Sequence, residues 1–92
     1  MAKEIEVIVT GWVQGIMFRD FTKRGARALG LLGTVKNFPD GSVHVIAQGE
    51  EEQLKKLIER LERGSLWSRI DNVAVSWSEP VHTFERFDIL YS

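Results

Sequence analysis

Apolar and polar residues alternate near the start of the chain, and this period of two is typical of a strand with one buried face. We predict this strand over roughly residues 4–12. Its expected buried residues are Ile5, Val7 and Val9. The apolar spacing then lengthens to three or four residues, which predicts an amphipathic helix from Phe18 to near Gly30. The apolar face expected for this helix comprises Phe18, Phe21, Gly25, Ala28, Leu29 and Leu32.

The rest of the chain continues with alternating strand and helix patterns. A second strand is expected to begin at Val35 and to lead through the turn at 39–41 into a third strand that begins at Val43, so that the two form a hairpin. A second helix follows Gly49 and ends near the cap candidate Gly64. Its exposed face is expected to carry the ion pairs Glu52–Lys56 and Glu59–Arg63. A fourth strand is expected at Val73, Val75 and Trp77, and a short fifth strand at Phe87, Ile89 and Tyr91.

This order of elements predicts an α+β, ferredoxin-like (βαββαβ) sandwich. In that fold, two helices pack on one face of an antiparallel sheet, and here a short fifth strand follows at the C-terminal end. With 92 residues, of which 43% are hydrophobic, the chain has room for one core, so residues 1–92 are expected to form a single domain. Many unrelated functions share this architecture, so the fold alone does not indicate an activity.

Composition narrows the classes of function. The chain has no cysteine, which excludes disulfides and thiolate metal sites. Its formal charge of −1 argues against broad attraction to nucleic acid or to a membrane surface, so any anion site must be local. The first residues alternate charged with apolar side chains and lack the apolar block of a signal peptide, and we expect a cytoplasmic protein, monomeric and without cofactor.

The segment Gly11–Arg19 is the most informative part of the chain. Two glycines bracket a tight connection from the first strand to the first helix. Such a turn can direct successive backbone N–H groups at one point, where the helix dipole favours a small anion such as phosphate. Arg19 can add a planar guanidinium that binds two phosphate oxygens. On these grounds alone, a tight loop followed by a surface arginine is the slightly favoured interpretation.

A set of short motifs resembles the signature of the acylphosphatase family. The matching residues are Gly11, Val13-Gln14-Gly15, Phe18-Arg19, Ala28-Leu29-Gly30-Leu31, Gly33, Val35-Lys36-Asn37, Asp40-Gly41-Ser42-Val43, Gly49, the segment from Ile70 to Trp77, and Phe87-Asp88-Ile89. The resemblance implies a ferredoxin-like enzyme that hydrolyses small acyl phosphates and whose phosphate site accepts inorganic phosphate or sulfate. It implies that Arg19 binds the phosphate and that Asn37 positions the attacking water. It also implies that the backbone from Gln14 through Gly15, Ile16, Met17 and Phe18 to Arg19 forms a phosphate cradle.

Several positions depart from the common family pattern. Met17 stands in the cradle where glycine or an aromatic residue is common, and Thr34 replaces a frequent tryptophan. Phe38 follows Asn37 where many relatives have a threonine, and the prolines usual around residues 64–67 are missing. We expect the changes at Met17, Thr34 and Phe38 to affect rate and substrate preference rather than reaction type, whereas the missing prolines leave the conformation of their loop open.

Other functions find less support in the sequence. An RNA-binding module would share the order of elements, but the chain has neither the aromatic–basic motif of such modules nor a surplus of basic residues. An anion-binding domain without turnover is the second alternative. His44 and His82 follow no metal-ligand spacing, so no metal site is predicted. Ser42 and Ser65 show no recognisable histidine and acid partners in the sequence, and Trp12 is expected beside the entrance of the cradle.

Overall fold

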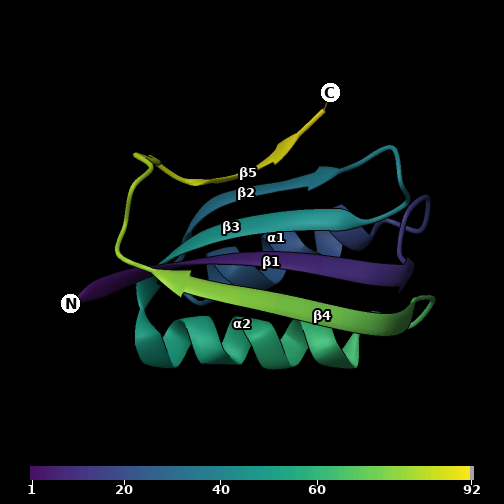
Figure 1. Ribbon diagram of the computed structural model, residues 1–92, viewed down its shortest axis with the longest axis horizontal. Helices are drawn as coiled ribbons and strands as arrows, with labels where there is room; N and C mark the ends of the chain where they lie inside the picture. The colour runs from purple at the N-terminus through teal and green to yellow at the C-terminus, as the bar shows by residue number, and fades with distance from the viewer. Residues whose placement is uncertain (92) are drawn as a thin grey trace.

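The computed structural model describes residues 1–91, and its two helices cover one face of a five-stranded sheet (Figure 1). The elements in chain order are β1 (Ala2–Trp12), α1 (Phe18–Ala28), β2 (Leu32–Asn37), β3 (Val43–Glu50), α2 (Glu51–Arg63), β4 (Arg69–Ser78) and β5 (Phe87–Leu90). The predicted ferredoxin-like order of strands and helices is therefore confirmed. No helix in residues 1–91 is long and apolar enough to cross a membrane.

The strands are arranged in the order β4-β1-β3-β2-β5. β1 pairs antiparallel with β3 and with β4, and β2 pairs antiparallel with β3. The short fifth strand differs from the antiparallel sheet that was expected, because it lies parallel to β2. This direction follows from the connection after β4, which leaves one edge of the sheet and returns at the other edge (Figure 1).

The core lies between the sheet and the helices. Every second residue of β1 and β3 faces it, and α2 contributes leucines from one side. Side chains with no exposed surface include Ile5, Val7, Val9, Val35, Val43, Val45, Leu54, Leu57 and Leu61. Because the chain has no disulfide, this apolar burial is the main stabilising contribution, at about 25 cal/mol per Å².

The buried face of α1 differs in part from the expected one. Ala28 is exposed, whereas Thr22 and Ala26 are fully buried. A threonine is tolerated in the core because its Oγ1 donates a hydrogen bond of 3.0 Å to the carbonyl oxygen of Phe18. The buried face of α1 is therefore rotated slightly about the helix axis from the face predicted by the apolar residues alone.

Two further expectations about local structure were wrong. β2 begins at Leu32, three positions before Val35, because Gly33 extends the strand at a φ of 149°. A side chain at Gly33 would collide with the carbonyl oxygen of Ile46, so the glycine permits close pairing with β3. On α2, the ion pairs present in the described chain join Lys55 to Glu51 and Glu52, at 3.1 and 3.8 Å, in place of the pairs expected from Lys56 and Arg63.

Candidate active site

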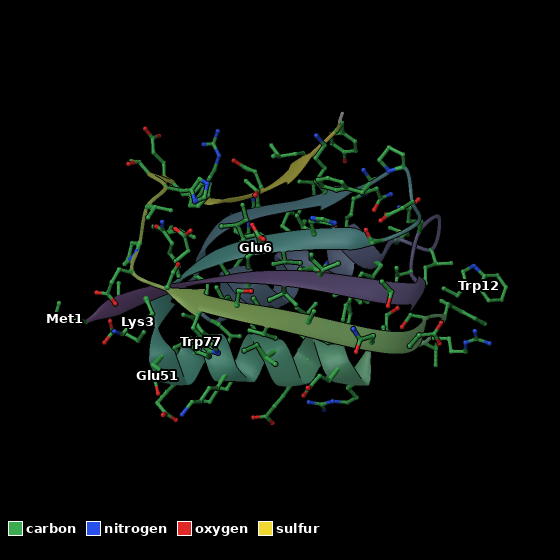
Figure 2. The ribbon with its side chains drawn as sticks, in the orientation of Figure 1. Met1, Lys3, Glu6, Trp12, Glu51 and Trp77 are labelled. Carbon is green, nitrogen blue, oxygen red and sulfur yellow. The ribbon has the colours of Figure 1, made fainter. Side chains whose placement is uncertain are left out.

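The strand directions bring three chain segments to one end of the sheet. β1 and β2 are both antiparallel to β3, and β5 is parallel to β2. The C-terminal ends of β1, β2 and β5 therefore lie at the same end of the sheet. The cradle segment follows β1, Asn37 is the last residue of β2, and Tyr91 follows β5. The predicted site residues are thus gathered at one end, which is also where Trp12 projects into solvent (Figure 2).

The cradle is a tight turn anchored at both sides by buried side chains. Val13 and Phe18 are each 1% exposed, while Gly15 and Met17 between them adopt positive φ angles of 76° and 63°. Among the described residues, the backbone N–H groups of residues 15–19 have no hydrogen-bond acceptor. The last of these groups belong to the first turn of α1, where the positive end of the helix dipole lies. The turn therefore offers a row of free donors to an anion.

Arg19 is half-buried in the first turn of α1 and has no carboxylate partner in residues 1–91. The neighbouring Asp20 pairs instead with Arg24, at 2.8 Å, and with Lys23, at 3.8 Å. The guanidinium carbon of Arg19 lies 4.8 Å from the centre of the Tyr91 ring, which gives a cation–π contact. An arginine that rests on an aromatic ring keeps its N–H donors free in the plane of the guanidinium.

Asn37 lies at the last position of β2, opposite Val43 of β3. Alternation places its side chain on the core face with Val35 and leaves it half-buried. Its Oδ1 atom is buried and has no hydrogen-bond partner among the described residues. A buried amide oxygen without a donor is costly, so the half-buried Asn37 side chain is stabilised by any rotation that brings this atom to a hydrogen-bond donor.

The side chain of Gln14 joins the cradle to the turn that follows Asn37. Its Nε2 atom donates to the carbonyl oxygens of Phe38, at 2.7 Å, and of Ser42, at 2.9 Å. The sequence motif predicts a role only for the backbone of Gln14, so this side-chain role is an addition. The signal that could have indicated this role is a long amide side chain within a tight turn, since such a side chain can satisfy the carbonyl groups of a neighbouring turn.

The turn after Asn37 is held by a second set of contacts, which corrects one expectation. Ser42 donates its hydroxyl to Asp40 Oδ1 at 2.6 Å and lies 3.0 Å from His44 Nε2, so a serine, a histidine and an acid do meet here. Asp40, Ser42 and His44 follow one another at intervals of two residues, and this spacing did not indicate that they form a cluster. Ser42 is 2% exposed, and its hydroxyl already donates to Asp40. Ser42 therefore supports the turn and is not positioned as a nucleophile. These hydrogen bonds lower the pKa of Asp40 below its usual value.

Phe38 faces away from Asn37. Its ring stacks on the imidazole of His44, with centroids 3.6 Å apart, and Lys36 lies 5.5 Å from the same ring. Lys36 and His44 are cross-strand partners on the face of the sheet that the helices leave open. Phe38 therefore stabilises the outer side of the turn, while Asn37 lies on its inner side.

His82 belongs to a separate cluster around Glu4. Burial raises the pKa of Glu4, but hydrogen bonds from Gln48, from the His82 side chain and from the backbone of His82 and Val81 outweigh this effect and lower the pKa to about 2. Glu4 is 4% exposed, and the His82 Nδ1 atom lies 2.8 Å from its Oε2. The cluster attaches the connection between β4 and β5 to the sheet. In the described part of the chain, no group of three acidic or histidine residues is suited to hold a metal ion.

Comparison with known proteins identifies the family of this chain. The family model for acylphosphatase matches residues 5–89. An acylphosphatase of Salinibacter ruber is 41% identical over 87 residues, which cover 95% of this chain and 92% of that protein. An acylphosphatase of Caldanaerobacter subterraneus subsp. tengcongensis is 39% identical over 97% of this chain and 99% of its own. The crystal structure of acylphosphatase from Bacillus subtilis matches with a TM-score of 0.93 and 36% identity, over 97% of this chain and 99% of that one. The chain therefore belongs to the acylphosphatase family of enzymes.

Proposed function

We propose that the cradle and Arg19 bind the phosphoryl group of an acyl phosphate, and that Asn37 positions the water that attacks it. The observation that carries this proposal is the row of N–H groups at residues 15–19 that have no acceptor in residues 1–91, next to a guanidinium that has no carboxylate partner in the same residues. Free backbone donors at a helix N-terminus together with one arginine match the charge and shape of a phosphoryl group. Inorganic phosphate and sulfate should bind to the same donors and compete with the substrate.

The reaction needs positioning and charge stabilisation more than it needs a strong base. Phosphoryl transfer to water passes through a loose transition state whose charge spreads over the equatorial oxygens. The cradle and Arg19 stabilise these oxygens, while Asn37 Oδ1 accepts a hydrogen bond from the attacking water and orients it. The water oxygen bonds to phosphorus as the bond from phosphorus to the acyl oxygen breaks. The proton lost by the water passes to a phosphate oxygen, so that the products of the dianionic substrate are a carboxylate and dihydrogen phosphate.

The side chains at the site fit an acyl leaving group better than an alkyl one. A carboxylate leaves readily because its conjugate acid has a pKa of about 4, so it needs no general acid. An alkoxide leaving group is far more basic and normally requires a metal ion or a protonated acid. Arg19 and Asn37 supply neither of these, and Asp40 is occupied by its hydrogen bonds with Ser42.

Phosphate release from benzoyl phosphate tests this function. The wild type should hydrolyse it, and Arg19→Ala should reduce kcat/KM at least about a thousandfold, because an arginine at a transferring phosphoryl group contributes about 10³ to 10⁵ in rate. Arg63→Ala is the matched control, since Arg63 is also a helical arginine but is exposed on α2 and lines a cavity that contains no cradle residue. That control should keep its activity within about twofold, and both variants should unfold within about 3 °C of the wild type.

The same assay separates the alternative functions. An anion-binding domain without turnover would bind phosphate but release none from benzoyl phosphate. An RNA-binding module would neither bind phosphate nor release it from benzoyl phosphate, and it would bind single-stranded RNA. Full activity in a folded Arg19→Ala variant would contradict the assignment of Arg19.

A further inference from the structure

Three large apolar side chains lie exposed around one cavity beside the cradle. Met17, Leu66 and Trp67 are 73%, 86% and 74% exposed, and all three line a cavity of about 410 Å³. Single exposed apolar residues are common on protein surfaces, but several that converge on one cavity indicate a binding surface. Ile16 of the cradle lines the same cavity, so this apolar surface is continuous with the proposed phosphate site.

Met17 connects the apolar surface with Arg19. The same side chain also lines a smaller cavity with Arg19 and Tyr91, so it lies between the guanidinium on one side and Trp67 on the other. Its backbone is left-handed, with φ 63° and ψ 26°. This conformation costs a residue with a side chain roughly 1–2 kcal/mol and is common at functional sites.

The direction of attack separates the leaving group from Asn37. In phosphoryl transfer the attacking and leaving oxygens lie roughly in line through phosphorus. With the water held at Asn37, the acyl oxygen must leave on the side of the phosphoryl group that is remote from Asn37. Asn37 lines a separate cavity with Lys36, Phe38 and Pro39, whereas the cavities that contain Met17 do not include it.

The loop that carries Leu66 and Trp67 is held in a fixed turn. The Ser68 hydroxyl accepts from the backbone N–H of Ser65, at 2.7 Å, and donates to the carbonyl oxygen of Ser65, at 3.0 Å. The backbone N–H of Ser68 donates to the same carbonyl oxygen, at 3.2 Å. These bonds define the turn even though the prolines common in the family are missing, and they present both apolar side chains with little further loss of entropy on binding.

The charged groups around this cavity are already engaged. Arg24 pairs with Asp20 at 2.8 Å. Arg60 donates to the carbonyl oxygen of Phe21, at 3.2 and 3.4 Å, and its guanidinium carbon lies 4.0 Å from the centre of the Phe21 ring. The Arg24 side chain is still 73% exposed, so the cavity combines the apolar contacts of Met17, Leu66 and Trp67 with cationic N–H groups at its side.

We infer that Met17, Leu66 and Trp67 form the subsite for the acyl group, so that this enzyme prefers acyl phosphates with an apolar acyl group of about the size of a ring. This inference rests on the proposed function of the cradle and extends it to substrate class. Trp67 provides the largest apolar surface of the three and is the residue whose removal should weaken the subsite most.

Benzoyl phosphate and acetyl phosphate test the inference, because they share the reacting group and differ in the apolar acyl part. The wild type should have a KM for benzoyl phosphate about tenfold below its KM for acetyl phosphate. Trp67→Ala should raise the KM for benzoyl phosphate about tenfold and change the KM for acetyl phosphate less than about twofold, with kcat nearly unchanged for both. Leu66→Ser should show a smaller change in the same direction.

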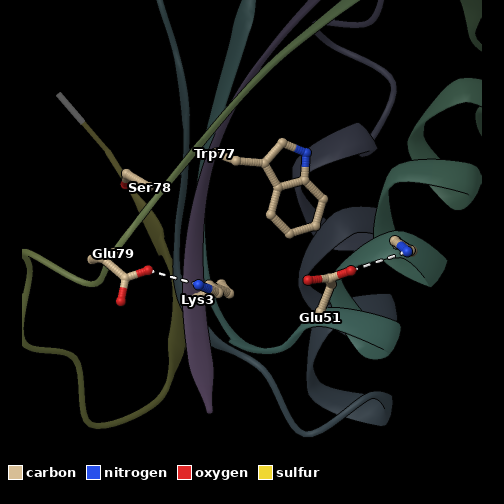
Figure 3. A pocket seen from close by; sticks show the side chains of 6 residues that line it. Lys3, Glu51, Trp77, Ser78 and Glu79 are labelled. Carbon is tan, nitrogen blue, oxygen red and sulfur yellow. Dashed lines mark hydrogen bonds and ion pairs between the residues drawn. The ribbon is translucent and has the colours of Figure 1, made fainter.

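Trp77→Ala is the matched control. Trp77 lies at the opposite end of the sheet from Trp12, in a separate cavity between the ion pairs Lys3–Glu79, at 2.8 Å, and Glu51–Lys55, at 3.1 Å (Figures 2 and 3). Its replacement should leave both KM values unchanged. An unaltered ratio of the two KM values in folded Trp67→Ala and Leu66→Ser variants would overturn the acyl subsite while the hydrolysis itself stands. Failure of the wild type to hydrolyse either substrate would instead overturn the proposed function.

Discussion

The side-chain amide of Gln14 lies 2.7 Å from the carbonyl oxygen of Phe38, so the cradle is bonded directly to the residue after Asn37. The same nitrogen also donates to the carbonyl oxygen of Ser42, at the far side of the turn. Two parts of the site that are distant in sequence are thus held at a fixed separation. A displacement of about 1 Å between reacting groups can reduce a rate about a hundredfold.

We therefore predict that Gln14→Met, which keeps the length of the side chain but removes both donors, lowers kcat for benzoyl phosphate about 10- to 100-fold. The inhibition constant for inorganic phosphate should change less than about threefold, because the cradle N–H groups and Arg19 remain. Gln53→Met on α2 is the control and should behave as the wild type. If the loss of phosphate binding matched the loss of kcat, Gln14 would be a phosphate ligand and not a positioning residue.

The ring of Tyr91 is expected to hold the Arg19 guanidinium in place before substrate binds. An exposed cation–π contact contributes about 0.5–1 kcal/mol, so Tyr91→Ala should raise the inhibition constant for phosphate about two- to fivefold. Tyr91→Phe keeps the ring and should leave that constant unchanged. Isothermal titration with phosphate measures both variants, and equal affinity in the two would show that the ring does not prepare Arg19.

Glu4 is expected to make the stability of the fold depend on pH in the acid range. Its pKa of about 2 lies below its ordinary value of 4.5, so its contribution to stability is present above about pH 4.5 and is lost as the pH falls towards about 2. Glu4→Gln should lower the free energy of unfolding at neutral pH by on the order of 3 kcal/mol. The difference from the wild type should shrink steadily below pH 4.5.

Urea unfolding between neutral pH and about pH 2 measures this difference, with Glu6→Gln as the control. Glu6 lies on the same strand but is exposed, so its replacement should change the free energy of unfolding by no more than about 0.5 kcal/mol at any pH. A difference between Glu4→Gln and the wild type that stays constant with pH would mean that Glu4 contributes through packing alone.

The fold could be predicted from the sequence because the helices and strands carry strong periodic patterns, as in β1 and α2. The predictions were wrong where tertiary contacts outweigh the local pattern of apolar and polar residues. Gly33 was not predicted to belong to β2, and its place in the strand depends on its close approach to the backbone of Ile46. Thr22 is buried in the core because its hydroxyl donates to the backbone of its own helix. The parallel direction of β5 depends on the path of a connection that has no periodic pattern.

The site could be predicted only as far as local motifs extend. Arg19 and Asn37 belong to short motifs, and strand directions then bring them to one end of the sheet. The contacts of Gln14 with Phe38 and of Arg19 with Tyr91 join residues that are far apart in the chain. No spacing rule indicates such pairs, so a single sequence does not predict them.

Hydrolysis should not depend on a metal ion. EDTA should leave the turnover of benzoyl phosphate unchanged, and glycerol phosphate should be hydrolysed at a negligible rate, because its alkoxide leaving group needs an acid or a metal. Turnover should also show no step near the histidine pKa of about 6.5, since His44 contacts Ser42 and His82 contacts Glu4, and neither belongs to the proposed phosphate site. Turnover of glycerol phosphate that is sensitive to chelator would require a different chemistry.

The division of roles between Arg19 and Asn37 is tested most directly by measuring kcat and the inhibition constant for phosphate in Asn37→Ala. We predict that kcat for benzoyl phosphate falls about 10²- to 10³-fold, because the attacking water loses its acceptor. Phosphate should still inhibit competitively, with its inhibition constant within about threefold of the wild-type value, because the cradle and Arg19 are intact. Loss of phosphate binding together with kcat in a folded Asn37→Ala variant would contradict this account and would make Asn37 a ligand of the phosphate.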